Sequence, residues 1–262
     1  METNNKELYK SIFAKLKDVK IESMFDTMNK DLFMGIATGS SQPIIGEELD
    51  KILTENNITG NTATYLKECI PNEASFRHHS IDISQYKIHI EYFVLLDREL
   101  SGKYKEYLNY DTTKADDSIP PAVVSIQLSD NIEDESIPLI TATIIVSEFS
   151  NTVTDATFSK IVKHELTHIL LAYITQIMRV PVFCDDTLQV PLLSPEEQAM
   201  FEEFICDYIQ YESIGIISNE SPITRFEDDV KNYMKPHMHE TYLPFIDAVI
   251  AYYLDKDKSD NE

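Results

Sequence analysis

The spacing of apolar residues predicts a first half that mixes helices and strands. Leu8, Ile12, Phe13, Leu16 and Val19 recur at helical intervals, which predicts a helix over residues 5–20. A shorter helix is expected over Glu47–Glu55, before a turn-rich loop at residues 56–62. Three segments rich in β-branched and aromatic residues then predict strands, at Tyr86–Leu96, Ala122–Leu128 and Leu139–Phe149.

The second half of the chain is predicted to be helical. A long helix is expected over residues 156–179, with Asp155 as its cap. Ser194 and Glu197 have the spacing of a capping box, which predicts a helix that continues to about residue 211. Two further helices are expected, at residues 221–236 and Thr241–Leu254.

These elements together predict an α+β protein. We expect a small, twisted, mixed sheet packed on the long helix, followed by a helical C-terminal part. The boundary between the two parts is placed near residue 180. This gives an N-terminal α+β subdomain over residues 1–180 and a helical subdomain over residues 181–262.

The long predicted helix contains the sequence His164-Glu165-Leu166-Thr167-His168. From the composition of the chain, a His-Glu-x-x-His pattern is expected by chance only about 0.017 times. Residues four apart lie on one face of a helix, so both imidazoles can reach one ion. The motif therefore indicates a zinc site, with Glu165 beside the first ligand.

The neighbours of the motif favour this interpretation. The alternative is a pair of exposed histidines on an amphipathic helix, whose neighbours would include charged side chains. Six residues in and beside this motif are instead uncharged: Ile161, Val162, Leu166, Thr167, Ile169 and Leu170.

A catalytic zinc ion needs a third protein ligand, and an acidic segment at residues 201–209 offers one. Glu203 and Asp207 lie four apart on an otherwise apolar helix, so one can bind the metal while the other orients a ligating histidine. Glu202 has Cys206 at the same offset and lacks an acidic partner. We therefore expect Glu203 to be the ligand and Asp207 its supporting acid, against the alternative of a solvated helix edge.

His164–His168 followed by Glu203 and Asp207 resembles the zincin metallopeptidases, specifically the thermolysin-like gluzincin pattern. The resemblance implies a zincin-like fold, a bound Zn²⁺ and peptidase activity. It covers the two motifs and the order of the elements around them, over residues 137–211. The spacing from His168 to Glu203 is longer than in thermolysin, so the insert at residues 180–193 is expected to loop out.

The resemblance also implies a place for the substrate and a mechanism. The family's edge strand, which pairs with an extended substrate, is similar in position to Leu139–Phe149. Glu165 would act as the general base. His237, His239 and Tyr242 are candidate donors to a developing oxyanion. For the two histidines, the alternative is a surface turn.

The remaining histidines are expected to be structural. His78 and His79 follow Arg77 in what reads as a polar surface loop. His89 alternates with apolar residues along a predicted strand, and we expect it on the polar face of that strand.

Charge and composition exclude some classes of function. The net charge of −23 argues against binding a nucleic-acid backbone, which requires a basic surface. No apolar run approaches the ~20 residues of a membrane span, and no signal peptide is expected. The three cysteines lack CxxC spacing, which is typical of free thiols in a reducing compartment.

We therefore expect a cytoplasmic protein, or a virion-associated one if its origin is viral. The partner would be a peptide or protein substrate, and no pattern indicates an oligomeric state. Two other functions stay open. One is a zincin-fold structural or binding protein in a larger or viral assembly, with a non-catalytic metal. The other is an acidic decoy or inhibitor in which the motif is accidental.

Overall fold

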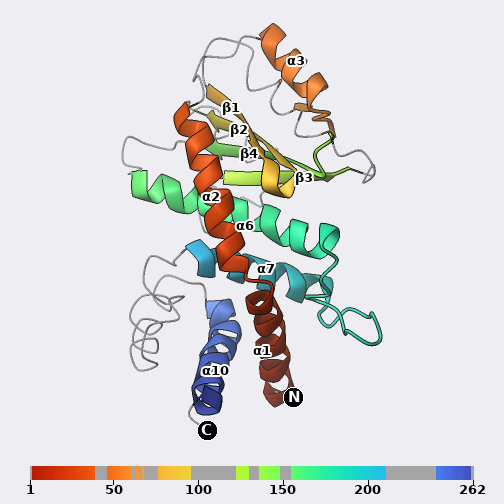
Figure 1. Cartoon of the computed structure of the whole chain (residues 1–262), viewed down its shortest axis with the longest axis vertical. Helices are drawn as coiled ribbons and strands as arrows, with labels where there is room; N and C mark the ends of the chain where they lie inside the picture. Colours follow the sequence, from red (N-terminus) through yellow and green to blue (C-terminus); the bar gives the residue numbers. More distant parts are fainter. Residues whose placement is uncertain are drawn as a thin grey trace, which may run out of the picture. The chain divides into compact units, whose positions relative to one another are not determined.

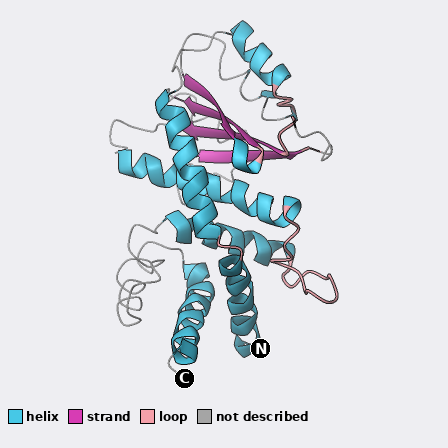
Figure 2. Ribbon diagram, viewed as in Figure 1, coloured by secondary structure: helices cyan, strands magenta, loops and turns pink. Residues whose placement is uncertain are grey.

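The computed structural model describes residues 2–38, 46–60, 63–64, 67, 76–95, 122–129, 136–147, 155–210 and 240–260. Within them the chain is α+β, as expected, with a four-stranded mixed sheet and several helices (Figures 1 and 2). The helices are α1 (Glu2–Asp18), α2 (Ile21–Thr38), α3 (Gly46–Glu55), α6 (Asp155–Ala172), α7 (Pro195–Gln210) and α10 (Leu243–Asp260). The strands are β1 (Phe76–Ile83), β2 (Ile88–Leu95), β3 (Ala122–Leu128) and β4 (Ile140–Ser147).

Most of the helices and strands lie where the sequence pattern predicts them. α1, α3 and α10 match predicted helices, and β2, β3 and β4 match the three predicted strands. α2 and β1 were not anticipated. The predicted helix at residues 221–236 lies outside the described residues. None of the described helices combines the length and the apolar character needed to cross a membrane.

The chain forms two compact units, and it passes from one to the other within α2 and again within α6. Unit 1 comprises Met1–Thr27 and Leu166–Glu262, and unit 2 comprises Met28–Glu165. The first helix thus joins the same unit as the C-terminal helices. The boundary near residue 180 was placed from the content of helix and strand alone, and it stays a prediction.

In unit 1, α1 and α10 lie side by side (Figure 1). Their contact is aromatic: the rings of Tyr9 and Phe245 are 4.7 Å apart, and those of Phe13 and Tyr252 are 5.3 Å apart. Both ring pairs meet edge to face, the arrangement that aromatic quadrupoles favour. An ion pair between Lys10 and Asp255 joins the same two helices at the surface.

The sheet of unit 2 has the strand order β1-β2-β4-β3. β2 and β4 are parallel, and the outer strands β1 and β3 run antiparallel to their neighbours. The expectation that residues 139–149 form the edge strand was therefore wrong, because β4 is paired on both sides. Among the described residues, β3 pairs on one side only and is the edge strand nearest to β4 along the sheet.

β1 also corrects the interpretation of His78 and His79 as part of a surface loop. Both lie in β1, paired with Phe93 and Tyr92 of β2, and His79 is only 7% exposed. This strand has histidine where a strand normally carries an apolar inward residue. Its hydrophobic alternation is therefore too weak to recognise in the sequence.

One face of the sheet is apolar. The strand register places Ile81, Ile90, Ala142, Ile144 and Ile126 on this face, and the first four are buried. α2 covers it at close range: a Cβ added to Gly35 would lie 2.9 Å from the side chain of Ile81. Glycine at this position therefore lets the helix approach the sheet.

The opposite face of the sheet carries polar residues on all four strands, beside the buried apolar residues Phe93 and Ile145. The same register aligns the following residues on it: Ser80, Asp82, His89, Glu91, Ser125, Gln127, Thr141 and Thr143. Glu91 is fully buried and Thr143 is 4% exposed. A buried carboxylate is costly unless it is well hydrogen-bonded, so the surroundings of Glu91 require an explanation.

Two histidines stabilise this carboxylate. His78 Nε2 and His89 Nε2 both lie within hydrogen-bond distance of Glu91, the latter at 2.6 Å. His89 also contacts Asp82 through Nδ1 at 2.7 Å. A carboxylate can only accept hydrogen bonds, so an imidazole ring with a carboxylate at each nitrogen must donate a hydrogen bond from both nitrogens. His89 is therefore an imidazolium cation in this arrangement.

The charges in this network shift the pKa values of its members in the expected directions. The hydrogen bond to Glu91 raises the pKa of His89 and outweighs burial, which lowers it, while Asp82 raises it further. Burial raises the pKa of Glu91, but the hydrogen bonds from His78 and His89 outweigh burial and hold this pKa below its usual value. The expected polar face of β2 is thus a charged, partly buried network.

We expect His89→Gln to lower the free energy of unfolding by about 2 kcal/mol at pH 6, because it leaves a buried carboxylate without its cationic partner. A raised histidine pKa gives stability that is fully present below the unfolded pKa of about 6.5. That stability is lost as the pH rises through the folded pKa, so the difference between variant and unmutated chain should shrink. Urea unfolding followed by circular dichroism between pH 5.5 and 9 measures it.

Asp82→Asn is the matched control, since the Asp82 side chain is 72% exposed and the loss should be smaller. A difference for His89→Gln that stays constant across this pH range would contradict the assignment of His89 as a cation.

Candidate metal centre

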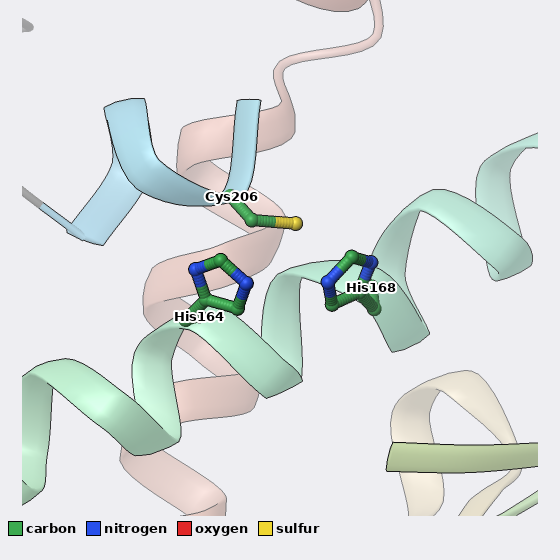
Figure 3. A group of neighbouring side chains, drawn as sticks. All are labelled: His164, His168 and Cys206. Carbon is green, nitrogen blue, oxygen red and sulfur yellow. The ribbon is translucent and has the colours of Figure 1, made fainter. Parts of the chain in front are cut away.

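α6 carries the His-Glu-x-x-His motif and is held by its apolar face. Val162, Leu166, Ile169 and Leu170 are fully buried at helical spacing. His164 and His168 lie on another face, one turn apart, and are partly exposed (Figure 3). The packing of the apolar face therefore determines the direction in which the two imidazoles point.

The end of α6 differs in detail from the expected single helix over residues 156–179. The α-helix ends at Ala172 and continues as one wider turn over Tyr173–Ile177, closed by a hydrogen bond from Met178 N to Tyr173 O. Arg179 then adopts a left-handed conformation, φ 53°, which ends the helical segment.

The insert between α6 and α7 is anchored at its base and exposed at its tip. Val182, Phe183 and Leu193 are buried, whereas Leu188 is 70% exposed. Lys15 of α1 donates to the carbonyl oxygens of Pro181 and Cys184, each at 3.0 Å, and to Asp186 Oδ1 at 2.7 Å. These hydrogen bonds hold the insert, which leads into α7, against α1.

α7 begins at the predicted capping box. Glu197 N donates to Ser194 Oγ at 3.2 Å, and Ser194 N donates to Glu197 Oε2 at 2.9 Å. These reciprocal bonds satisfy two backbone N–H groups that the first turn of a helix leaves free. The start of α7 at Pro195 is confirmed.

One face of α7 is buried in an aromatic cluster. Phe201 and Phe204 each contact Phe245 of α10, with ring centroids 5.0 Å and 5.4 Å apart, and Phe13 contacts Tyr208 at 5.6 Å. Burying rings of this size contributes a large share of the stability of a small unit. The cluster therefore holds α7 in one rotational setting.

The face of α7 next to the aromatic one carries the candidate metal ligands. Cys206 is fully buried, although it does not belong to the aromatic stripe. Ring nitrogens of His164 and His168 and the Sγ atom of Cys206 all lie within 4.8 Å of one another. Figure 3 shows the thiol of α7 directed toward the space between the two imidazole rings of α6.

This is the one such group of three or more histidine, cysteine or acidic donors among the residues that the structure describes. Zinc binds imidazole nitrogen and thiolate sulfur at ~2.0–2.1 Å and ~2.3 Å, so donors around one tetrahedral ion lie about 3.4–3.6 Å apart. Small side-chain rotations would bring the three donors to that spacing. Their chemistry suits a zinc ion.

Glu203, the predicted third ligand, lies close to one of the histidines. Its Oε1 atom is 3.5 Å from His168 Nε2, and its side chain is 47% exposed. Glu203 does not belong to the compact group of donors. Glu202 is engaged elsewhere, since its Oε1 accepts a hydrogen bond from Gln198 Nε2 at 2.9 Å.

The sequence pattern indicated a free thiol at Cys206 and not a ligand. Cys206 is buried, and it also faces the histidines. The signal was available: Cys206 lies three residues after Glu203, so the two side chains share one side of the helix.

Of the expected oxyanion donors, only Tyr242 lies within the described residues; His237 and His239 lie outside them. Tyr242 belongs to the 3₁₀ turn Glu240–Tyr242, which contacts α7, and its ring is 6.1 Å from that of Phe204. Burial, and after it the negative charges of Asp207 and Glu203, raise its pKa to about 12. Tyr242 therefore keeps its proton at neutral pH and can donate a hydrogen bond.

The general-base candidate, Glu165, is 7% exposed on α6. It lies between the two histidines in the sequence, where a carboxylate can serve proton transfer while the imidazoles bind an ion. Asp207 is partly exposed on α7, and its charge acts on Tyr242.

Comparison of the chain with models of known protein families, with curated proteins and with solved structures gives no match. The assignment of a function therefore depends on the chemistry of the site itself.

Proposed function

We propose that the chain is a zinc-dependent metallopeptidase that hydrolyses a peptide bond in an intracellular protein or peptide. One observation carries the proposal: two imidazoles on one helix and a donor on a second helix converge, and the buried Glu165 lies between the imidazoles in sequence. A donor set of two histidines and one further ligand, with a nearby carboxylate, is typical of catalytic zinc in hydrolases.

The fold proposed with this function is zincin-like. Its support is the order of the elements: a small mixed sheet, then the helix with the two histidines, then a helix with the third donor. The thiol of Cys206 beside the histidines departs from the gluzincin pattern, which has a glutamate as its third ligand. The third ligand in our proposal comes from α7 and is Glu203 or Cys206.

Different residues of the chain carry out the separate steps of hydrolysis. When bound, zinc supplies a Lewis acid that polarises the attacking water and the scissile carbonyl. Glu165 accepts the proton of that water and returns it to the leaving amine. Tyr242, which stays protonated, donates a hydrogen bond to the oxyanion that develops on the carbonyl oxygen.

The edge strand β3 is the proposed docking strand for an extended substrate. Among the described residues its outer edge pairs with no other strand, so its backbone groups can bond to a peptide. This moves the role expected for residues 139–149 to Ala122–Leu128.

A structural metal site is the second candidate function. The buried thiol favours it, because structural zinc sites often contain cysteine and have four closed protein ligands. If Glu203 and Cys206 both bound the ion with the two histidines, no position would be open for water. The chain would then be a zincin-fold structural or binding protein.

We expect the purified full-length chain to contain about one zinc ion and His168→Ala to lose it, because the ligands that remain bind zinc too weakly to retain it through purification. Elemental analysis of protein purified without chelators measures this. His89→Ala is the matched control, because it removes a histidine of the sheet network and should leave the zinc content unchanged. An unmutated chain without zinc, or a His168→Ala variant that keeps it, would refute the metal site.

We expect Glu165→Gln to keep the zinc and the fold but to lower kcat/KM for peptide cleavage by about 10²–10⁴, because the amide cannot accept a proton. Cleavage of a mixture of synthetic peptides, followed by mass spectrometry, measures it. Glu202→Gln is the control and should cleave normally, since Glu202 is bonded to Gln198. Equal cleavage by Glu165→Gln and the unmutated chain would exclude Glu165 as the base. Zinc without cleavage in the unmutated chain would favour the structural function.

A further inference from the structure

Two donors of α7 compete for the third ligand position beside His164 and His168. Cys206 is a thiol within the compact group of donors. Glu203 is a carboxylate 3.5 Å from one of the histidines. This distance alone would suit a shared ion, so the choice must rest on the placement of each donor relative to both histidines and on burial.

The placement of the donors favours Cys206. Its Sγ atom lies within 4.8 Å of a ring nitrogen of both histidines, whereas Glu203 approaches His168 without joining the group. In Figure 3 the sulfur points into the space that both rings face. An ion placed between the rings would meet the sulfur with the smallest movement of side chains.

Burial leads to the same choice. Cys206 is fully buried, so its thiolate can form only if a cation compensates for lost hydration. The Glu203 side chain is 47% exposed, and water can solvate its charge without any metal. A bound ion would therefore stabilise the charged form of Cys206 far more than that of Glu203.

We infer that Cys206, and not Glu203, is the third protein ligand of the metal, which gives the site the donor set His₂Cys. The inference rests on the proposed metal site and defines its chemistry. Three protein ligands leave one position open for water, as hydrolysis requires. Glu203 is then a carboxylate beside His168 and outside the coordination sphere.

The thiolate also selects the class of metal. Sulfur ligands favour zinc and other thiophilic divalent ions, whereas carboxylate-rich sites accept magnesium, calcium and manganese. A His₂Cys site should therefore bind Zn²⁺, Co²⁺ and Cd²⁺ and should not bind Mg²⁺ or Ca²⁺.

Cobalt substitution tests the ligand directly, because a thiolate bound to Co²⁺ gives a charge-transfer band in the near ultraviolet and a carboxylate does not. The full-length chain, stripped of metal and titrated with Co²⁺, should show this band at one equivalent. Cys206→Ser should lose the band and bind zinc more than about 100-fold more weakly. Cys184→Ser, Cys69→Ser and Glu203→Gln should keep the band.

The unmutated chain alone can overturn the inference, whether or not Cys206→Ser folds. One bound cobalt ion without a charge-transfer band would exclude a thiolate ligand and leave the peptidase proposal, with Glu203 as ligand, in place. No bound cobalt would refute the metal site itself. A band that persists in a folded Cys206→Ser variant, or disappears in Cys184→Ser or Cys69→Ser, would assign the thiolate to another cysteine.

Discussion

The aromatic cluster of unit 1 fixes α7, and the setting of α7 decides which of its side chains meet the histidines of α6. Phe201, Phe204 and Tyr208 bury one side of this helix against rings of α1 and α10. The side chain of Cys206, on the adjoining side of α7, then lies near the histidines of α6. Rotation of α7 by a fraction of a turn would replace one donor by another. The composition of the candidate site is thus set by packing away from it.

The histidines on the polar face of the sheet differ in protonation state from those of the candidate metal centre. There the buried carboxylate of Glu91 is balanced by histidines that carry protons, and His89 donates from both of its nitrogens. In the metal centre the imidazoles would instead be neutral and give their lone pairs to an ion. Histidine thus acts as a protonated hydrogen-bond donor in unit 2 and as a proposed metal ligand on α6.

Local signals in the sequence were sufficient to predict the two helices that carry the candidate site and one strand of the sheet. The capping box at Ser194, the helix around His164 and the strand at Ala122–Leu128 all follow from short-range patterns. Strand order was not predictable in this way, because pairing between distant segments decides it, and β4 proved internal. β1 was missed because His79 occupies an inward position that normally reveals a strand by an apolar residue.

The third ligand shows the same limit at the scale of one helix. Glu203 and Cys206 lie three residues apart, so the sequence places both near α6 and cannot rank them. The difference between them is one of rotation and burial, which depend on contacts of α7 with residues as distant as Phe13 and Phe245. Only the packed structure distinguishes a buried thiol from a half-exposed carboxylate.

X-ray absorption at the zinc edge of the zinc-loaded, full-length chain can show whether α6 and α7 together bind one zinc ion. We expect the outer-shell scattering of two imidazoles, together with one sulfur atom at ~2.3 Å from the metal. A coordination shell that lacks the imidazole scattering would contradict it.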